Sequence, residues 1–163
     1  MITHPFPPLF DKNSKILILG SFPSVKSREE MFFYGHPQNR FWKVVSVVLG
    51  CSLPVSTEEK RKMLLENKIA LWDVIASCEI TGSSDSSIRN VKENDLSEIL
   101  EKADIKQIFV NGKTAEKYYN KYTKNYTGRE AICLPSTSPA NAAYSVEKLI
   151  DSWKIIKSVA SIQ

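Results

Sequence analysis

The apolar positions along the chain follow two different periods. Nearly continuous apolar runs, which are typical of buried strands, occupy residues 15–20, 69–75, 105–110 and 131–134. Between them, apolar residues recur at spacings of three and four, which predicts helices over residues 39–49, 56–68, 95–103 and 113–122 and one that begins after Ser145. The polar, serine-rich stretch 76–94 predicts a long loop.

Strands that alternate with helices predict β-α-β units. We therefore expect an α/β fold with a three-layer α/β/α arrangement, in which a central, mostly parallel, four-stranded sheet is formed by a single domain over residues 1–163. Sheets of this kind bind ligands at the carboxyl ends of their strands. That rule selects the segments that follow the strands, residues 20–24, 77–87, 111–112 and 135–141.

Composition and charge narrow the class of protein only slightly. Of the 163 residues, 42% are hydrophobic and 25% are charged, which is ordinary for a soluble globular protein. The net charge of +4 is compatible with a phosphate-rich partner and equally with plain solubility. No stretch reaches the roughly 18 apolar residues of a membrane span, and no apolar run of signal-peptide length begins the chain. We expect a cytoplasmic monomer without a membrane contact.

The cysteines do not indicate a metal site. Cys51, Cys78 and Cys133 are far apart, and the chain contains no C-x-x-C pair, so zinc or iron–sulfur binding is not supported. We expect three free thiols in a reducing compartment. The usual signatures of nucleotide-binding loops, zinc proteases and serine-hydrolase elbows are also absent.

The segment Tyr-Gly-His-Pro-Gln-Asn-Arg-Phe-Trp, residues 34–42, is the most distinctive part of the chain. Phe41 and Trp42 fall on the apolar face of the predicted helix and are expected in the core. Tyr34 lies on a loop, where a tyrosine can act as a stacking platform. Asn39 stands at the start of the predicted helix, where its position fits a helix cap and a catalytic amide equally well.

Together with two further segments, residues 34–42 resemble the uracil-DNA glycosylase superfamily. They are similar to the H-P-x-N-x-F-W segment of the mismatch-specific uracil and thymine glycosylases. Gly-Ser-Phe-Pro-Ser at 20–24 stands where that superfamily has its first catalytic motif, and Pro-Ser-Thr-Ser-Pro-Ala-Asn at 135–141 stands where it has its second. The three motifs in combination are most similar to the hypoxanthine-DNA glycosylase branch, and the resemblance extends over residues 15–153.

Two positions depart from the uracil-removing members of the superfamily. Phe22 stands where they carry an Asp or Asn that orients the attacking water. Leu134 precedes the second motif where several of them carry a histidine that stabilises the departing base. Both departures argue against efficient uracil removal, and the resemblance to the hypoxanthine branch implies that Asn39 takes the essential catalytic role.

The resemblance implies hydrolysis of the N-glycosidic bond of a deaminated base, above all hypoxanthine, in DNA with the damaged nucleotide flipped out of the duplex, without metal or cofactor. Asn39 would hydrogen-bond either the base or the water, and both options stay open. The base would be bound by Ser21, Phe22 and Tyr34. The surrounding DNA would be bound by Pro23, Ser24, Ser136, Thr137, Ser138, Pro139, Ala140 and Asn141. No lysine lies in the matched motifs, which predicts a monofunctional enzyme that leaves an abasic site.

Three alternative functions stay open, and two further carboxylates lie near the predicted site. A mismatch-specific uracil or thymine glycosylase is the nearest alternative, and Phe22 disfavours it. A small-molecule hydrolase would use Ser136 or Ser138 with His36, and an inert nucleic-acid-binding module would keep only the fold. Two carboxylates, Asp73 in the second strand and Asp85 in the long loop, are expected to be ordinary polar residues, although a carboxylate there could position water.

Overall fold

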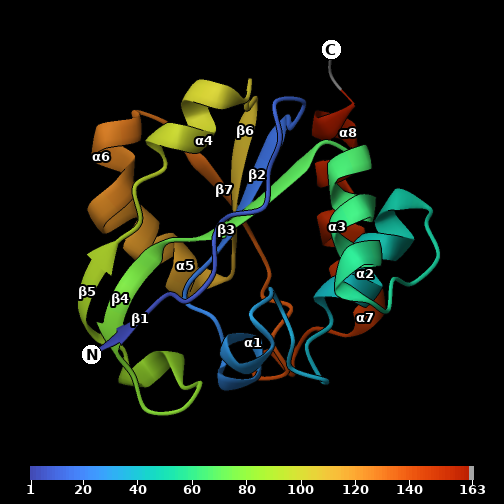
Figure 1. Ribbon diagram of the computed structural model, residues 1–163. Helices are drawn as coiled ribbons and strands as arrows, with labels where there is room; N and C mark the ends of the chain where they lie inside the picture. Colours follow the sequence, from blue (N-terminus) through green and yellow to red (C-terminus); the bar gives the residue numbers. More distant parts are fainter. Residues whose placement is uncertain (162–163) are drawn as a thin grey trace.

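The computed structural model describes residues 1–161, and a four-stranded parallel sheet forms its centre (Figure 1). The strand order is β3 (Ile69–Asp73), β2 (Ile16–Gly20), β6 (Gln107–Asn111) and β7 (Ala131–Leu134). All three neighbouring pairs are parallel. The first two strands are buried along their whole length, which explains their uninterrupted apolar sequence. The predicted α/β fold with a central four-stranded sheet is confirmed.

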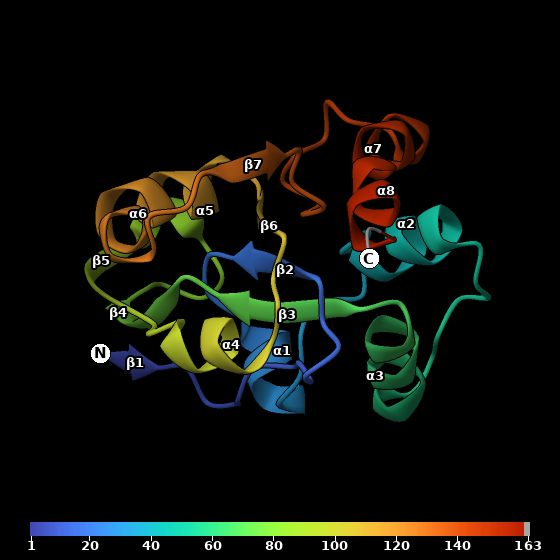
Figure 2. The ribbon, with the colours of Figure 1, turned by 90° about the horizontal axis from the view of Figure 1, so that it is seen from above.

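Helices cover both faces of this sheet, as Figures 1 and 2 show from two directions. One layer contains α2 (Phe41–Leu49), α3 (Thr57–Glu66), α7 (Val146–Trp153) and α8 (Ile155–Ala160). The other contains α4 (Ser97–Lys102), α5 (Lys113–Tyr118) and α6 (Lys124–Thr127), with a π-helical turn at Tyr119–Thr123. The single helix expected over 113–122 is therefore interrupted. No helix within residues 1–161 is both long and apolar enough to cross a membrane.

Local side-chain caps set several helix starts. The Ser56 hydroxyl accepts a hydrogen bond from the Glu59 N–H, and the Glu59 carboxylate accepts one from the Ser56 N–H. Ser145 caps α7 in the expected place. Ser24 caps a short helix, α1 (Val25–Glu30), which the apolar pattern did not predict because only one of its residues is buried.

The long loop expected over 76–94 is wrong. β4 (Ile75–Glu79) and β5 (Arg89–Glu93) form an antiparallel pair, joined by a loop with a 3-10 turn at Asp85–Ser87. The pairing is interrupted by register shifts, and β5 has no fully buried residue, so its sequence lacks the apolar alternation of a half-buried strand.

The N-terminal strand β1 (Ile2–Thr3) completes this second sheet, in the order β1-β4-β5. It pairs antiparallel with β4, and the N–H of the next residue, His4, donates to the carbonyl of Ala76 at 2.7 Å. The start of the chain is therefore fixed beside the carboxyl end of β3, where it contributes to the site described next.

Candidate active site

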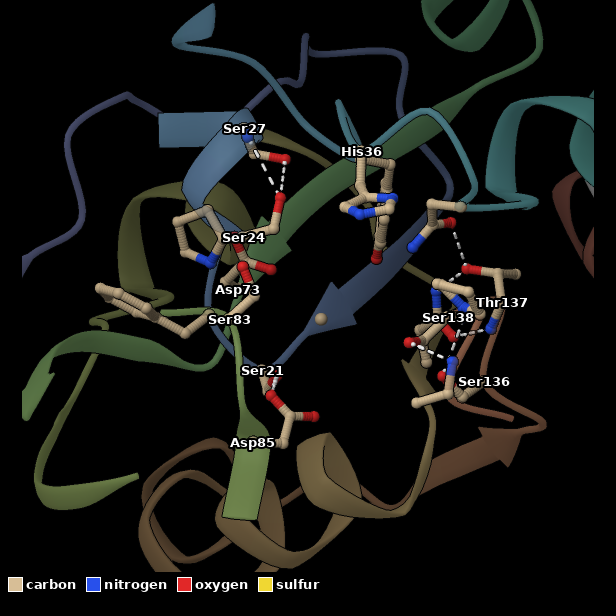
Figure 3. Close-up of a pocket in the computed structure, with 18 of the residues that line it drawn as sticks. Ser21, Ser24, Ser27, His36, Asp73, Ser83, Asp85, Ser136, Thr137 and Ser138 are labelled. Carbon is tan, nitrogen blue, oxygen red and sulfur yellow. Dashed lines mark hydrogen bonds between the residues drawn. The ribbon is translucent and has the colours of Figure 1, made fainter. Parts of the chain in front are cut away.

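A cavity of about 510 Å³ opens at the carboxyl ends of the central strands (Figure 3). It is lined by the loop after β2, the segment before α2 and the loop after β7, which carry the three motifs. Eleven of the twelve expected site residues line it, namely Ser21, Phe22, Pro23, Ser24, Tyr34, Asn39, Ser136, Thr137, Ser138, Pro139 and Ala140. Asn141 lies behind the wall, and its Nδ2 donates to the carbonyl of Ser136 at 3.0 Å.

The Asn39 amide is held in one orientation. Its Oδ1 accepts hydrogen bonds from the Phe41 N–H at 2.9 Å and from the Thr137 hydroxyl at 2.9 Å. A backbone N–H can only donate, so the accepting atom must be the oxygen. Nδ2 has no acceptor among residues 1–161, yet it is not buried. The N-cap of α2 is Arg40 and not, as the sequence suggested, Asn39; from the position before it, the Asn39 oxygen accepts the first helical N–H, and its NH2 group stays available to the cavity.

A buried polar network fixes Asn39 from the sheet. The Thr137 N–H donates to Asn111 Oδ1 at 3.1 Å, and Asn111 Nδ2 donates to the Thr137 hydroxyl at 3.0 Å. The Thr137 hydroxyl must then give its own hydrogen to Asn39. Thr137 is fully buried and its hydroxyl is occupied on both sides, so it positions Asn39 rather than offering a hydroxyl to a phosphate. Asn111 was missed as an individual residue, although its place at the end of β6 marked the segment 111–112.

Tyr34 supplies an aromatic surface to the cavity. Its ring stacks on Phe41 with 4.0 Å between centroids and 11° between planes, so its remaining face and edge are what it offers to a ligand. Its backbone is left-handed at φ 53°, an uncommon conformation for a bulky residue. The hydroxyl is buried without a hydrogen-bond partner in the described chain. Burial, and after it the charge of Asp73, raises the pKa of Tyr34 far above its usual value. The side chain of Asn111 acts in the opposite direction and lowers this pKa.

Phe22 and Asp85 also line the cavity. Phe22 is 8% exposed, and the Arg28 guanidinium lies 5.7 Å above its ring. Asp85 Oδ1 accepts a hydrogen bond from the Ser21 hydroxyl at 3.2 Å. Burial raises the pKa of the Asp85 carboxyl, while hydrogen bonds from Ser21 and Thr114 lower it. Asp85 is therefore part of the cavity wall and not of a loop remote from the site.

Asp73 is a second carboxylate in the cavity. It ends β3 directly beside Gly20, its register partner in β2, and is 4% exposed. Its Oδ2 lies 2.7 Å from His4 Nε2, and both side chains are almost completely enclosed. The sequence marked Asp73 only as an interruption of an apolar strand, and it carried no signal for His4, which lies 69 residues away.

Arg40 shapes the loop after β7. Its guanidinium donates to the carbonyls of Thr137, Ser138, Asn141 and Tyr144, with distances of 3.4, 2.8 and 3.0 Å for the first three. These bonds hold the loop around the Arg40 side chain. Pro139 and Ala140 are exposed at the tip of the loop.

The arrangement needed for a serine hydrolase is not assembled. His36 Nδ1 accepts a hydrogen bond from the Gln38 N–H at 3.1 Å, and the Ser136 hydroxyl accepts one from the Ser138 N–H at 3.1 Å. Among the hydrogen bonds of residues 1–161, none joins His36 to either serine. His36 thus fixes a local turn.

Comparisons with known proteins agree with this site. The family model of the uracil DNA glycosylase superfamily matches residues 7–160. A protein from Methanosarcina acetivorans named hypoxanthine DNA glycosylase is 39% identical over 89% of this chain and 92% of its own length. One of the same name from Methanosarcina barkeri is 35% identical over 83% of this chain and 86% of its own.

Similarity in three dimensions extends over nearly the whole chain. A solution NMR structure of a Methanosarcina acetivorans protein, provisionally named a uracil DNA glycosylase, superposes with a TM-score of 0.82 at 35% identity. It covers 98% of this chain and 99% of that one. The family match spans all three motif segments around the cavity. The chain therefore belongs to the uracil DNA glycosylase superfamily and is a DNA glycosylase.

Proposed function

We propose that this enzyme removes hypoxanthine from DNA by hydrolysing the N-glycosidic bond and leaves an abasic site. The observation that carries the proposal is the fixed amide of Asn39, whose NH2 group is the part left for a ligand, next to the aromatic surface of Tyr34. Both curated relatives are named hypoxanthine DNA glycosylase, which supports this base as the substrate.

Asn39 acts on the departing base. Cleavage of the bond between the sugar and N9 leaves an electron pair on the base, while the sugar passes through an oxocarbenium-like state. A fixed hydrogen-bond donor stabilises that growing negative charge. An attacking water instead needs an acceptor for its proton, and the Asn39 oxygen is already occupied by Phe41 and Thr137. Of the two roles left open by the sequence, donation to the base is the one that fits.

The flipped base stacks on the free face of Tyr34, and Phe22 provides a second aromatic wall of the same cavity. A base inside the duplex is out of reach, so the nucleotide is extruded at a cost of about a few kcal/mol. The backbone N–H groups of Ser21 and Phe22 have no acceptor within residues 1–161 and are available for base oxygens. We also propose that the enzyme acts as a monomer in the cytoplasm.

The surrounding strand is held by the two small-residue loops. Ser24, Ser136 and Ser138 lie at the cavity with short polar side chains, which together with backbone N–H groups suit phosphate oxygens. Pro23 lines the cavity beside them, and Pro139 and Ala140 form an exposed apolar tip that can fill the gap left in the duplex. Asn141 supports this loop through Ser136.

The test uses duplexes that contain one hypoxanthine, uracil or xanthine, followed by alkali. We expect strand breaks after alkali only, fastest with hypoxanthine, because no lysine lies in the motifs. Release of none of these bases would overturn the proposed function. Breakage without alkali would overturn the monofunctional mechanism, and faster release of uracil would favour the mismatch-specific alternative.

A further inference from the structure

The water that attacks the sugar has to lose a proton, and neither Asn39 nor His36 is free to receive it. The Asn39 oxygen already accepts two hydrogen bonds. His36 Nδ1 accepts a backbone N–H, so the neutral ring carries its hydrogen on Nε2 and has no second acceptor. Within residues 1–161, the carboxylates that line the cavity are Asp73 and Asp85. The proton acceptor is therefore to be sought between these two.

Asp73 is already engaged and lies on the side of the base. Its Oδ2 is 2.7 Å from His4 Nε2, and an ionised carboxylate can only accept, so His4 donates in this bond. A Cβ built on Gly20 would lie 2.5 Å from Asp73 Oδ1 and 3.0 Å from the Tyr34 hydroxyl, which places Asp73 next to the ring on which the base stacks. Water approaches the sugar from the face opposite the leaving group. Asp73 is thus poorly placed to meet it.

Asp85 reaches the cavity from a different element. It begins the 3-10 turn in the loop between β4 and β5, and its Oδ1 accepts a hydrogen bond from the Ser21 hydroxyl at 3.2 Å. Figure 3 shows these two side chains next to each other and apart from Thr137, which holds Asn39. A carboxylate has about four acceptor sites, so the hydroxyls of Ser21 and Thr114 leave it able to bind a water.

The loop that carries Asp85 is fixed to the site by backbone contacts. The Val25 N–H donates to the Ser83 hydroxyl at 2.9 Å, and the Arg28 guanidinium donates to the Gly82 carbonyl at 2.8 Å. Both bonds tie the β4–β5 loop to α1, which directly follows the first motif segment. Asp85 is therefore held at a defined place in the cavity wall, and its raised pKa makes it a better proton acceptor than an ordinary surface carboxylate.

We propose that Asp85 is the general base that takes a proton from the attacking water, and that Ser21 positions its carboxylate. This inference rests on the proposed function and adds a catalytic residue to it. The water oxygen forms a bond to C1′ as the bond between C1′ and N9 breaks, and the electron pair of that bond leaves with the base. One proton of the water passes to Asp85, which later returns it to the solvent, and the released base takes up a proton from the solvent.

Asp85→Asn removes the proton acceptor and keeps the shape of the side chain. We expect single-turnover release of hypoxanthine at saturating enzyme to fall by about 100-fold or more. Glu79→Gln is the matched control, because it makes the same change in the same hairpin at a residue that bonds to Asn90 and does not line the cavity. It should leave the rate unchanged. Thermal unfolding of each variant checks that it is folded.

Rescue by a small carboxylate separates a base from a merely structural residue. Asp85→Ala leaves space in the cavity wall into which formate can enter. Added formate should raise the rate of D85A by at least about tenfold, because it supplies the missing proton acceptor. It should leave the rates of the wild type and of E79Q unchanged.

A double-variant cycle tests the role of Ser21. Ser21→Ala removes the hydroxyl that binds Asp85 Oδ1 and keeps the backbone N–H. We expect S21A to lower the rate by about five- to tenfold in the wild type and by less than about twofold in D85N, since the positioned group is then already missing.

The outcomes separate the two proposals. If the wild-type enzyme releases none of the deaminated bases, the proposed function fails. If the wild type releases hypoxanthine and folded D85N keeps the rate, or if formate does not accelerate folded D85A, only the assignment of Asp85 as the general base is overturned. If the losses of S21A and D85N multiply in the double variant, the positioning by Ser21 is refuted.

Discussion

Exchange of Asn39 for Asp tests the catalytic assignment most directly. The aspartate keeps an oxygen where Oδ1 accepts from Phe41 and Thr137, and it removes the Nδ2 donor. Loss of one donor aimed at developing charge lowers the rate by about 100- to 1,000-fold, or about 3–4 kcal/mol. Stability should change by less than about 1 kcal/mol, because the acceptor for the Phe41 N–H is kept and a carboxylate suits a helix start.

Asn39→Ala provides the comparison. It removes the same donor and also the oxygen that accepts hydrogen bonds from the Phe41 N–H and the Thr137 hydroxyl. We expect a similar loss of rate together with a loss of about 1–3 kcal/mol in unfolding free energy. Single-turnover base release from a hypoxanthine duplex at saturating enzyme, together with thermal unfolding, measures both quantities.

The opposite result for Asp has a clear meaning. A carboxylate takes a proton from water more readily than an amide does, so an Asn39 that holds the water would be improved or spared by Asp. If Asn39→Asp releases hypoxanthine within about threefold of the wild-type rate, donation to the base is refuted.

Three further substitutions test the support around the site. Thr137→Val keeps the buried shape but breaks the link between Asn111 and Asn39. It should lower the free energy of unfolding by about 1–3 kcal/mol and the rate of base release by at least about tenfold. An unchanged rate in single-turnover assays would argue against positioning by Thr137. Arg40→Lys removes the guanidinium group that donates to four carbonyls. Binding to a hypoxanthine duplex should weaken, and the 136–144 loop should become more sensitive to protease. The control substitution Lys43→Ala, at an exposed position, should change neither. Tyr34→Phe keeps the stacking face and removes the buried hydroxyl. The raised pKa keeps that hydroxyl protonated in the folded protein, so the unfolding free energy of the wild type should fall more steeply above about pH 10 than that of the variant. Parallel curves of unfolding free energy against pH, measured by chemical denaturation, would contradict this.

Much of the fold followed from the sequence because its central strands are buried on both faces. Such strands are nearly uniform in apolar character, and β2 and β7 were found within one residue of their observed bounds. The second sheet could not be found in the same way. β4 and β5 are stabilised by backbone pairing with irregular register, and their exposed side chains follow no period of two.

For the site, the sequence determined which loops and residue types form it. Eleven of the twelve expected residues line one cavity because the carboxyl ends of parallel strands meet at one edge. What an individual side chain does there depends on its partners, which come from distant parts of the chain. Thr137 turned from an expected phosphate contact into the support of Asn39, and Asp73 from an ordinary polar residue into half of a buried pair.

The sequence by itself thus determined the layered sheet, the three motif loops and the type of chemistry, since periodicity and local motifs are properties of neighbouring residues. Only the tertiary structure decided the direction of each hydrogen bond. Phe41 and Thr137 fix the Asn39 oxygen and leave its NH2 group open to the cavity. The pairing of β1 with β4 brings His4 to Asp73, which lies 69 residues further along the chain. His4 binds one oxygen of Asp73 and leaves the other as an acceptor. Which face of an amide or carboxylate remains free is set by contacts that no local pattern encodes.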